Sequence, residues 1–582
     1  MRVSVVVPAY NEQGNLRKLV SRLQSDLCDP NFSHEIEILL VNDNSTDRTG
    51  DICEELAADD SSITIVHRTT NPGFGNAIKA GLSASSGDVL IPFMGDLSDD
   101  PSDIPKLVDA IEDGYDVAYA SRFTAGGSVD GYPRLKLFYN RSFNNLIRLL
   151  FGIRAKDVTN AFTAYRREVI EEIGIENIDS ESFDLTAELP LRAHIRGFQT
   201  TEVPVSWRSR DAGVSKLNAT RKGPLYLKRL SQMFLIGNVL ALSDLRDTIT
   251  SGSPLRFIGA SLLGVLILIG LFSVSGYEEV FGIVRRTQPA WLGAAAGAYV
   301  VSFLFRTWRF RVLLRTAGRL ATRGGVFRCI MSGWFVNFIL PARIGDAVRG
   351  LTLKTTESVP FGVAMGMVAV ERVLDMAVLG TGIVFITLFL LPGSDFGVLA
   401  AGAFAIALVI ALGLLVVYRY DEQLATILGN RYAAAEDAII ALTDSLEQLA
   451  RNPYAMVLSA LLSLPVWLLE ASTIYFSARA VGAELSAVAT ATAGIAAFVS
   501  QAVPVTPAGI GTYQATITAV LAGFGIDTST ATALSLVDQF TRVAVVYLIG
   551  AISLVHVGFR SRVYFRDRAN QDTSTPTLGD QQ

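Results

Sequence analysis

Residues 88–100, DVLIPFMGDLSDD, place a short apolar run directly before a cluster of acids. The run at 88–93 is typical of a buried strand, and similar runs occur at 3–7, 35–41, 63–67 and 117–120. Stretches of helical period separate these runs. The alternation predicts parallel βαβ units, so we expect the front of the chain to fold as a Rossmann-like α/β domain.

Acidic residues follow three of the expected strands, at the end where an open α/β sheet binds its ligands. Glu12 comes after the first run, Asp43 after the second, and Asp96 with Asp99 after the fourth. Converging carboxylates repel one another, so the cluster favours a hard divalent cation, Mg²⁺ or Mn²⁺, that also meets phosphate oxygens. Asp47 differs, because the sequence around it opens a helix and is typical of a helix cap.

Two further segments carry polar residues toward the same edge. Residues 71–81, NPGFGNAIKAG, form a glycine-spaced turn before a helix, which fits either a phosphate-binding loop or a tight turn with close helix packing. Residues 208–216, RSRDAGVSK, form a basic loop that is either solvated or supplies counter-charges to a diphosphate. Arg122 follows the run at 117–120.

In this order, the segments PAYNE (8–12), NDNSTD (42–47), NPGFGNAIKAG, GDLSDD (95–100), SRF (121–123) and RDAGVSK (210–216) resemble the inverting family 2 glycosyltransferases with the GT-A fold. Among these enzymes, the sequence is most similar to the dolichol-phosphate mannose synthases and related polyprenyl-phosphate glycosyltransferases, over roughly residues 1–240. The resemblance implies a nucleotide-sugar donor and a dolichyl or polyprenyl phosphate acceptor.

The resemblance also implies roles for individual residues. It assigns nucleotide-sugar binding to Pro8, Tyr10, Glu12, Val41, Asp43, Lys79, Gly95 and Asp96. It assigns catalysis and phosphate binding to Asp96, Arg122, Arg210 and Lys216. Because Met94 and Asn42 stand where the family often has Asp, Asp99 or Asp100 would join Asp96 on the metal. Asp157 and Glu188 are either further functional acids or helix-end and surface acids.

Transfer to a lipid phosphate makes limited chemical demands. A phosphate monoester is largely dianionic near neutral pH, with a second pKa of about 6. The departing diphosphate and the approach of two anions do need stabilisation, which a cation on Asp96 and the basic loop would supply. We therefore expect direct displacement with inversion and no dedicated catalytic base.

Charge is unevenly distributed over the 582 residues. Residues 1–250 carry 35 Asp and Glu and 27 Lys and Arg, whereas residues 251–582 carry only 20 and 23. The first part has the charge density of a water-soluble domain, and the second that of a lipid-embedded region. The lack of a clustered basic face excludes nucleic acid as a partner, and three scattered cysteines indicate neither a disulfide framework nor a zinc site.

We expect four parts: a GT-A glycosyltransferase domain at 1–223, an interfacial amphipathic helix and linker at 224–254, a polytopic all-α membrane domain at 255–560 and a disordered tail at 561–582. The apolar segments 137–151 and 225–242 are expected to lie in the membrane interface, with core helices as the alternative. After residue 257, roughly six to nine segments are expected to enter the lipid bilayer, one of them at 398–418.

Arginines indicate an orientation for the chain. Six of them, from Arg306 to Arg323, are expected to lie in one loop, and four more, from Arg560 to Arg568, follow the last expected span. The positive-inside rule then predicts a multi-pass protein of the cell membrane with its N-terminal domain and C-terminal tail in the cytoplasm. That arrangement requires an even number of complete crossings.

Two apolar stretches contain helix-breaking residues, FILPARIGD at 338–346 and VPVTPAGIG at 503–511. Each precedes a charged span, and 34 residues separate Pro341 from Asp375 and Pro504 from Asp538. The spacing predicts a diverged internal duplication with interrupted helices, an arrangement associated with transporters. Charged residues there form either functional or purely structural ion pairs. The candidates are Pro341, Arg343, Glu371, Arg372, Asp375, Pro504, Pro507, Asp538 and Arg542.

The segments FILPARIGDAVR, AVERVLDM and VPVTPAGIGTYQ resemble the membrane region of lysylphosphatidylglycerol synthases and flippase-like proteins, over about 255–560. The fusion is similar to archaeal dolichyl-phosphate hexosyltransferases of surface-layer N-glycosylation. The chain is therefore expected to transfer a hexose, by resemblance mannose from GDP-mannose, to dolichyl or polyprenyl phosphate at the cytoplasmic face. The alternative is a transporter of lipid-linked sugar whose front domain binds the cargo.

Overall fold

The computed structural model describes residues 1–27, 32–70, 72–208, 219–249, 254–339, 344–385, 433–502 and 506–574. The chain divides into two compact units. The front unit comprises Met1–Ala241 together with the segment that begins at Gly558, and the helical unit comprises Leu242–Val557.

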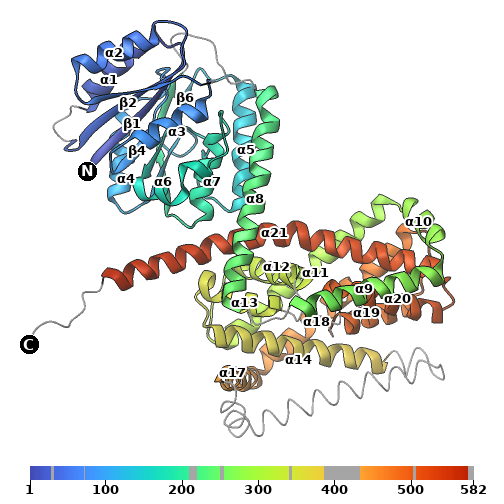
Figure 1. The fold of residues 1–582 in the computed structure, drawn as a ribbon. Helices are drawn as coiled ribbons and strands as arrows, with labels where there is room; N and C mark the ends of the chain where they lie inside the picture. Colours follow the sequence, from blue (N-terminus) through green and yellow to red (C-terminus); the bar gives the residue numbers. More distant parts are fainter. Residues whose placement is uncertain are drawn as a thin grey trace, which may run out of the picture. The chain divides into compact units, whose positions relative to one another are not determined.

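The front unit is built on a seven-stranded sheet in the order β3-β2-β1-β4-β7-β5-β8 (Figure 1). Only β7 runs antiparallel to its neighbours β4 and β5, and the other pairs in this sheet are parallel. The strands are β1 (Arg2–Ala9), β2 (Glu35–Asp43), β3 (Ile63–Arg68), β4 (Val89–Pro92), β5 (Val117–Ser121), β7 (Thr163–Arg166) and β8 (Thr200–Pro204). The five strands expected from the sequence are confirmed as β1 to β5. Two short strands, β6 (Ser128–Asp130) and β9 (Ser206–Arg208), form a separate parallel pair.

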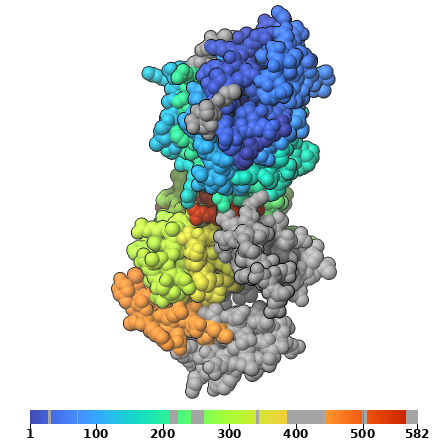
Figure 2. All heavy atoms as spheres, turned by 90° about the vertical axis from the view of Figure 1, so that its left-hand side faces the viewer, coloured from blue at the N-terminus to red at the C-terminus, as the bar shows by residue number. Residues whose placement is uncertain are grey.

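Helices pack on the sheet because their apolar sides bury against alternating strand residues. The front-unit helices are α1 (Leu16–Leu27), α2 (Thr49–Asp59), α3 (Phe74–Ala84), the 3-10 turn η1 (Pro101–Asp103), α4 (Ile104–Glu112), α5 (Arg134–Phe151), α6 (Arg167–Ile173), η2 (Ile175–Asn177), α7 (Leu185–Ile195) and the start of α8 (Ala219–Ile249). One core joins β1, β2 and β4 to α1 and α4, with Val5, Leu19 and Leu107 fully buried. Figure 2 shows that the first hundred or so residues, in blue, cover much of one face of this unit.

The carboxyl ends of the parallel strands meet at one edge of the sheet. β1 lies between β2 and β4, with Ala9 opposite Asn42 and Val6 opposite Pro92. β2 and β3 lie on one side of β1, and β4 lies on the other side. The strand order therefore reverses at β1, which makes this a topological switch point of the kind that binds ligands in α/β sheets. Two strand spacings separate β2 from β4, so Asp43 and the loop after β4 lie about 10 Å apart along the edge.

The helical unit consists of α-helices joined by short turns. They are α9 (Pro254–Ser275), α10 (Tyr277–Arg285), α11 (Pro289–Thr316), α12 (Arg323–Ile339), α13 (Ile344–Glu357), α14 (Phe361–Phe385), α17 (Ala433–Ala450), α18 (Pro453–Ala480), α19 (Ala487–Ala502), the turn η4 (Pro507–Gly509), α20 (Thr512–Gly523) and α21 (Thr528–Ser574). The second expected helix break is present, because the turn η4, with Ala508 at a φ of 53°, lies between α19 and α20. The first expected break, between α12 and α13, falls on residues 340–343, which lie outside the described residues.

Within the described residues, three helices are long and apolar enough to cross a membrane: Pro289–Thr316, Pro453–Ala480 and Thr528–Val563. A fourth candidate is the pair Ser261–Ser275 and Tyr277–Arg285, which bends by 91°. Shorter or more charged helices lie at the other expected positions, and the expected segment 398–418 lies outside the described residues. The number of complete crossings therefore stays a prediction.

The prediction that the arginines from Arg306 to Arg323 lie in one loop is wrong. Arg306, Arg309, Arg311 and Arg315 lie inside α11, and Arg323 begins α12. Arg309 is fully buried, and Arg306 is 2% exposed. They stay in the helix because carboxylates of other helices pair with them, so this cluster no longer supports an orientation by the positive-inside rule. The segment 561–582, expected to be a disordered tail, also differs from the prediction, since α21 continues to Ser574.

Candidate active site

The loops after β1 and β2 are tied together at the carboxyl edge of the sheet. The backbone amide of Asn11 donates to Ser45 Oγ at 3.1 Å, and that of Glu12 donates to Thr49 Oγ1 at 2.9 Å. A Cβ atom placed on Gly95 would lie 3.0 Å from the Pro8 carbonyl oxygen, so the loop after β4 passes over the end of β1. The structure thus brings the segment 8–12, which contains Tyr10, together with Gly95.

Asp43 ends β2 and is only 3% exposed. Its carboxylate pairs with Arg68 and accepts a hydrogen bond from the backbone amide of Gly73 at 2.7 Å. Asp43 therefore fixes the turn that begins α3 beside the end of β2. Val41, two residues earlier, buries its side chain against α3.

Asp96 and Asp99 lie in the loop after β4, as expected. Asp96 Oδ1 accepts a hydrogen bond from the Ser98 amide at 3.1 Å, and Asp99 forms an isolated bridge with Trp207. Among the described residues, Asp99 Oδ1 is a buried oxygen without a hydrogen-bond partner. Burial, together with the charge of Asp96, raises the pKa of Asp99 to about 7. An oxygen with these properties is suited to a ligand that carries positive charge.

A hard divalent cation fits these residues. In the described part of the chain, no group of three or more His, Cys, Asp and Glu side chains converges on a metal position. Mg²⁺ does not require such a group, because it is commonly held by one or two carboxylates together with substrate phosphates and water. Asp96 and the unpartnered oxygen of Asp99 would form that minimal set, and their role as metal ligands stays a prediction.

Arg122 forms a buried, two-pronged ion pair at the end of β5. Its Nε lies 2.6 Å from Asp157 Oδ2, and its Nη2 lies 2.8 Å from Asp157 Oδ1. Burial alone would lower the pKa of Arg122, but the charge and hydrogen bonds of Asp157 outweigh it and raise that pKa. Asp157, an acid of undecided role in the sequence, is thus the protein partner of Arg122.

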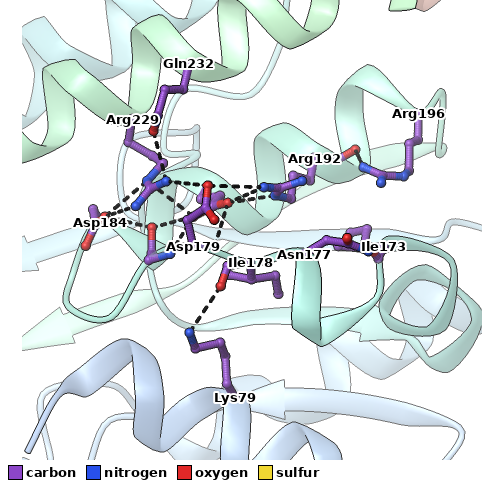
Figure 3. A network of polar contacts seen from close by, with 12 residues as sticks. Lys79, Ile173, Asn177, Ile178, Asp179, Asp184, Arg192, Arg196, Arg229 and Gln232 are labelled. Atoms are coloured by element: carbon purple, nitrogen blue, oxygen red, sulfur yellow. Dashed lines mark hydrogen bonds and ion pairs between the residues drawn. The ribbon is translucent and has the colours of Figure 1, made fainter. Parts of the chain in front are cut away.

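The glycine-spaced segment after β3 packs tightly against another loop. A Cβ atom on Gly75 would lie 2.8 Å from backbone atoms of residues 180–182, which favours the close-packing interpretation of these glycines. Lys79 Nζ donates to the Ile178 carbonyl oxygen at 3.1 Å (Figure 3). Lys79 therefore contacts the segment before α7, and its expected role in nucleotide-sugar binding stays a prediction.

Some expected site residues are not described by the structure. Arg210 and Lys216 of the basic loop lie outside the described residues, as do Pro341, Arg343 and Pro504. Pro507 is described only through its backbone, which begins η4. Their roles stay predictions.

The charged candidates of the helical unit form two buried networks. In the first, Arg309 pairs with Glu371 at 2.7 Å and with Asp375 at 2.6 Å, Arg349 also pairs with Glu371, and Arg372 pairs with Asp346. In the second, Arg542 pairs with Asp538 at 2.7 Å and with Glu470 at 2.8 Å.

Sequence reasoning missed several members of these networks, namely Arg306, Arg309, Asp346, Arg349 and Glu470. Arg306 pairs with Glu470 at 2.6 Å and links α11 to α18. One signal was available: Glu470 is the only acid in the apolar stretch 453–478. An acid in that setting predicts a buried cationic partner.

Fold and sequence together define the class of this protein: it is a glycosyltransferase with a GT-A-like α/β domain, followed by a helical region with several apolar helices. Residues 4–174 match the model of glycosyl transferase family 2, and residues 261–550 match the lysylphosphatidylglycerol synthase TM region. The chain belongs to glycosyl transferase family 2 and is a multi-pass membrane protein.

The relatives agree with this assignment. The chain is 27% identical over 603 residues to glycosyltransferase AglD of Haloferax volcanii, covering 95% of this chain and 93% of that protein. It is 35% identical over 223 residues to polyprenol monophosphomannose synthase of Mycolicibacterium smegmatis, covering 38% of this chain and 82% of the relative.

A solved structure of Mycobacterium tuberculosis glucosyl-3-phosphoglycerate synthase, in complex with Mn²⁺, uridine diphosphate and glucosyl-3-phosphoglycerate, matches 40% of this chain and 79% of its own at 19% identity. The TM-score is 0.31.

Proposed function

We propose that this chain transfers a hexose from a nucleotide sugar to dolichyl or polyprenyl phosphate, with inversion at the anomeric carbon. One observation carries the proposal: the loop after β4 presents Asp96 and the unpartnered, buried oxygen of Asp99 at the switch point of the sheet. The relative named as polyprenol monophosphomannose synthase supports a polyprenyl phosphate acceptor, and mannose as the sugar. GDP-mannose is the donor we propose.

Asp96 and Asp99 would hold Mg²⁺ or Mn²⁺, which when bound supplies Lewis-acid stabilisation of the diphosphate. The segment 8–12 and the turn held by Asp43 would bind the nucleoside. Arg122 is fixed by Asp157, and its remaining guanidinium N–H groups would donate to the phosphates without reorganisation during the reaction. The acceptor phosphate is already an anion near neutral pH, so positioning and charge stabilisation suffice without a general base.

Access to a lipid acceptor is supported by α5 and α8. The two helices pack through Phe143 on Tyr226 and through Phe151 on Phe234, with ring centroids 5.4 Å and 6.1 Å apart. Both also expose large apolar side chains, which is the expected property of helices that lie in a membrane interface. These side chains are Leu135, Phe138 and Leu149 on α5, and Leu227, Leu235 and Val239 on α8.

We further propose that residues 1–241 and the C-terminal segment that begins at Gly558 lie on the same, cytoplasmic side of the cell membrane. Both belong to one compact unit, within which Phe559 stacks on His194 with centroids 3.7 Å apart. Such contacts require an even number of complete crossings between α8 and the end of α21.

Labelled GDP-mannose, Mg²⁺ and polyprenyl phosphate provide the direct test with the purified full-length chain. The expected result is a labelled product that partitions into chloroform, is hydrolysed by mild acid and does not form in the presence of EDTA. If no sugar is transferred from any member of a panel of GDP- and UDP-sugars, the proposal is wrong.

A second candidate is transport of the lipid-linked sugar between leaflets. The observation that favours it is the matching position of two buried carboxylates in the helical unit: Asp375 in α14 and Asp538 in α21 each lie 34 residues after a proline, Pro341 and Pro504. Vesicles that contain the purified chain and a preformed glycolipid distinguish this activity. A transporter moves the glycolipid to the other leaflet without nucleotide sugar, whereas a transferase alone does not.

A further inference from the structure

Arg229, on α8, is a buried cation that contacts three acids of the front unit. Its guanidinium lies 3.1 Å from Asp179, 3.2 Å from Asp184 and 3.3 Å from Glu188 (Figure 3). Arg229 is 6% exposed, while Asp184 and Glu188 are almost completely buried. Ser180 Oγ bridges the same two carboxylates at 2.7 Å and 2.5 Å. Arg192 pairs with Glu188 at 2.6 Å, so Arg229 and Arg192 together neutralise acids that would otherwise repel one another at the start of α7.

The segment held in this way, residues 178–184, packs on the first turn of α3. Its Glu181 carbonyl oxygen accepts from the Asn76 backbone amide at 3.3 Å, and Phe183 stacks on Phe74 with centroids 4.6 Å apart. Lys79 adds its hydrogen bond to Ile178 from the same side. The segment 178–184 thus contacts α3 as well as Arg229.

The first turn of α3 belongs to the expected donor pocket. Gly73, next to Phe74, donates its backbone amide to Asp43 at 2.7 Å. A continuous series of contacts therefore leads from Arg229, through residues 178–184, to the turn that borders the end of β2. A shift of the segment would move this turn, because glycine at 73 and 75 leaves no space between the two backbones.

The C-terminal part of α21 also contacts α7. Phe559 stacks on His194, and an Arg562 guanidinium N–H donates to the Ile195 carbonyl oxygen. Within the front unit, the two helices that continue into the helical unit, α8 and α21, thus both contact α7. The N-terminal end of α7 is the end that adjoins the donor-side segment.

We propose that Arg229 is a positioning residue for nucleotide-sugar binding: it holds residues 178–184 against α3, and thereby the Gly73 turn beside Asp43. This inference rests on the proposed function. Lysine in its place keeps one positive charge but cannot reach three carboxylates with one planar fork. The segment would loosen, the donor would bind more weakly, and binding of the lipid acceptor would be unaffected.

Two variants test the two ends of this series in the full-length chain. Arg229→Lys changes the contact on α8, and Phe183→Leu removes the stacking on α3 while it leaves every ion pair in place. Each is expected to raise the KM for the nucleotide sugar about tenfold, with the KM for polyprenyl phosphate unchanged. Lys228→Gln, the exposed neighbour of Arg229, is the matched control and should behave like wild type.

Calorimetric binding of GDP and UDP is measured in parallel, because it does not require transfer. If wild type binds a nucleoside diphosphate but transfers no sugar, the proposed function fails while the positioning role is still tested by the dissociation constants. Unchanged nucleotide affinity in Phe183→Leu, or an equal loss of donor and acceptor affinity in Arg229→Lys, overturns the inference. Should Arg229→Lys not fold, the result for Phe183→Leu decides.

Discussion

At the residue scale, Arg122 and Asp157 form a fixed, buried ion pair beside the acidic loop. The Arg122 guanidinium donates two hydrogen bonds to the Asp157 carboxylate. The backbone amide of Arg122 donates a third, to Asp157 Oδ2 at 3.1 Å. Both side chains are excluded from water. A buried pair of this kind is strongly coupled, since removal of one charge leaves the other without compensation.

Asp157→Asn is therefore expected to destabilise the front unit by about 3–5 kcal/mol and to lower transfer activity. Asparagine keeps the shape of the side chain but leaves the Arg122 charge unpaired. Denaturant unfolding followed by circular dichroism measures the first effect. An unfolding midpoint equal to that of wild type would show that the pair contributes little.

The sequence predicted Arg122 at the carboxyl edge of the sheet but not its partner. Asp157 lies 35 residues further along the chain and precedes β7, which the sequence analysis did not identify. Its approach to β5 depends on the antiparallel insertion of β7 between β4 and β5. No local sequence pattern predicts that strand pairing. The acids of the β4 loop could be predicted because they directly follow their strand in the sequence.

At the element scale, α3 shows how geometry resolves an ambiguous motif. Residues 71–81 fitted both a phosphate loop and close packing. The backbone of residues 180–182 lies where a side chain at Gly75 would project, so packing alone accounts for glycine at this position.

Gly75→Ala is expected to push α3 away from residues 180–182, to cost about 1–3 kcal/mol of stability and to weaken donor binding. Gly14→Ala is the matched control, because a Cβ atom there meets nothing within 4 Å. Thermal unfolding and donor KM are measured for both variants. Equal behaviour of the two would contradict the packing account.

Glu188, on α7, leads to a prediction about how the stability of the front unit depends on pH. Burial alone would raise the pKa of Glu188, but hydrogen bonds from Ser180 and Arg192 and the charges of Arg192 and Arg229 lower it overall. A carboxyl whose pKa is lower in the folded state contributes stability above its unfolded pKa, near 4.3, and that stability is lost as the pH falls through the folded pKa.

Glu188→Gln should therefore reduce the loss of stability of the front unit on acidification below about pH 4.5. Denaturant unfolding of both proteins between pH 6 and pH 3 measures the difference. An identical slope of stability against pH in the two proteins would exclude Glu188 as a contributor.

The strands that sequence predicted best were the long or strongly apolar ones, β1 to β5. The short strands β6 and β9 were missed because three residues carry no periodic signal, and β7 was missed because its four residues merge into a polar context. The carboxyl edge could still be located, since it depends only on the order of strand and following loop.

At the scale of the whole molecule, α11 and α18 are joined by a buried ion pair in addition to apolar side chains. Arg306 and Arg542 share the carboxylate of Glu470, which is 12% exposed at its side chain. Counting arginines in the sequence assigned Arg306 to a loop, because its partner Glu470 lies 164 residues further along the chain. Only the folded arrangement reveals that these charges are paired.

Glu470→Gln is expected to destabilise the helical unit by about 3–5 kcal/mol, since two buried guanidinium groups lose their shared partner. Thermal unfolding of the full-length chain in detergent measures the loss. Glu447→Gln removes one member of an exposed pair with Arg451 and should change the midpoint little. If both variants unfold alike, the buried network is not a stabilising link.

The most direct test of the central claim compares Asp96→Asn with Asp113→Asn in the transfer of labelled mannose from GDP-mannose to polyprenyl phosphate. Asp113 is an exposed acid just beyond α4 and serves as the control. The account predicts that Asp96→Asn loses at least about a hundredfold of activity, with folding and membrane insertion intact, while the control keeps wild-type activity. Wild-type activity in Asp96→Asn would contradict the account, because the acidic loop after β4 would then have no part in the reaction.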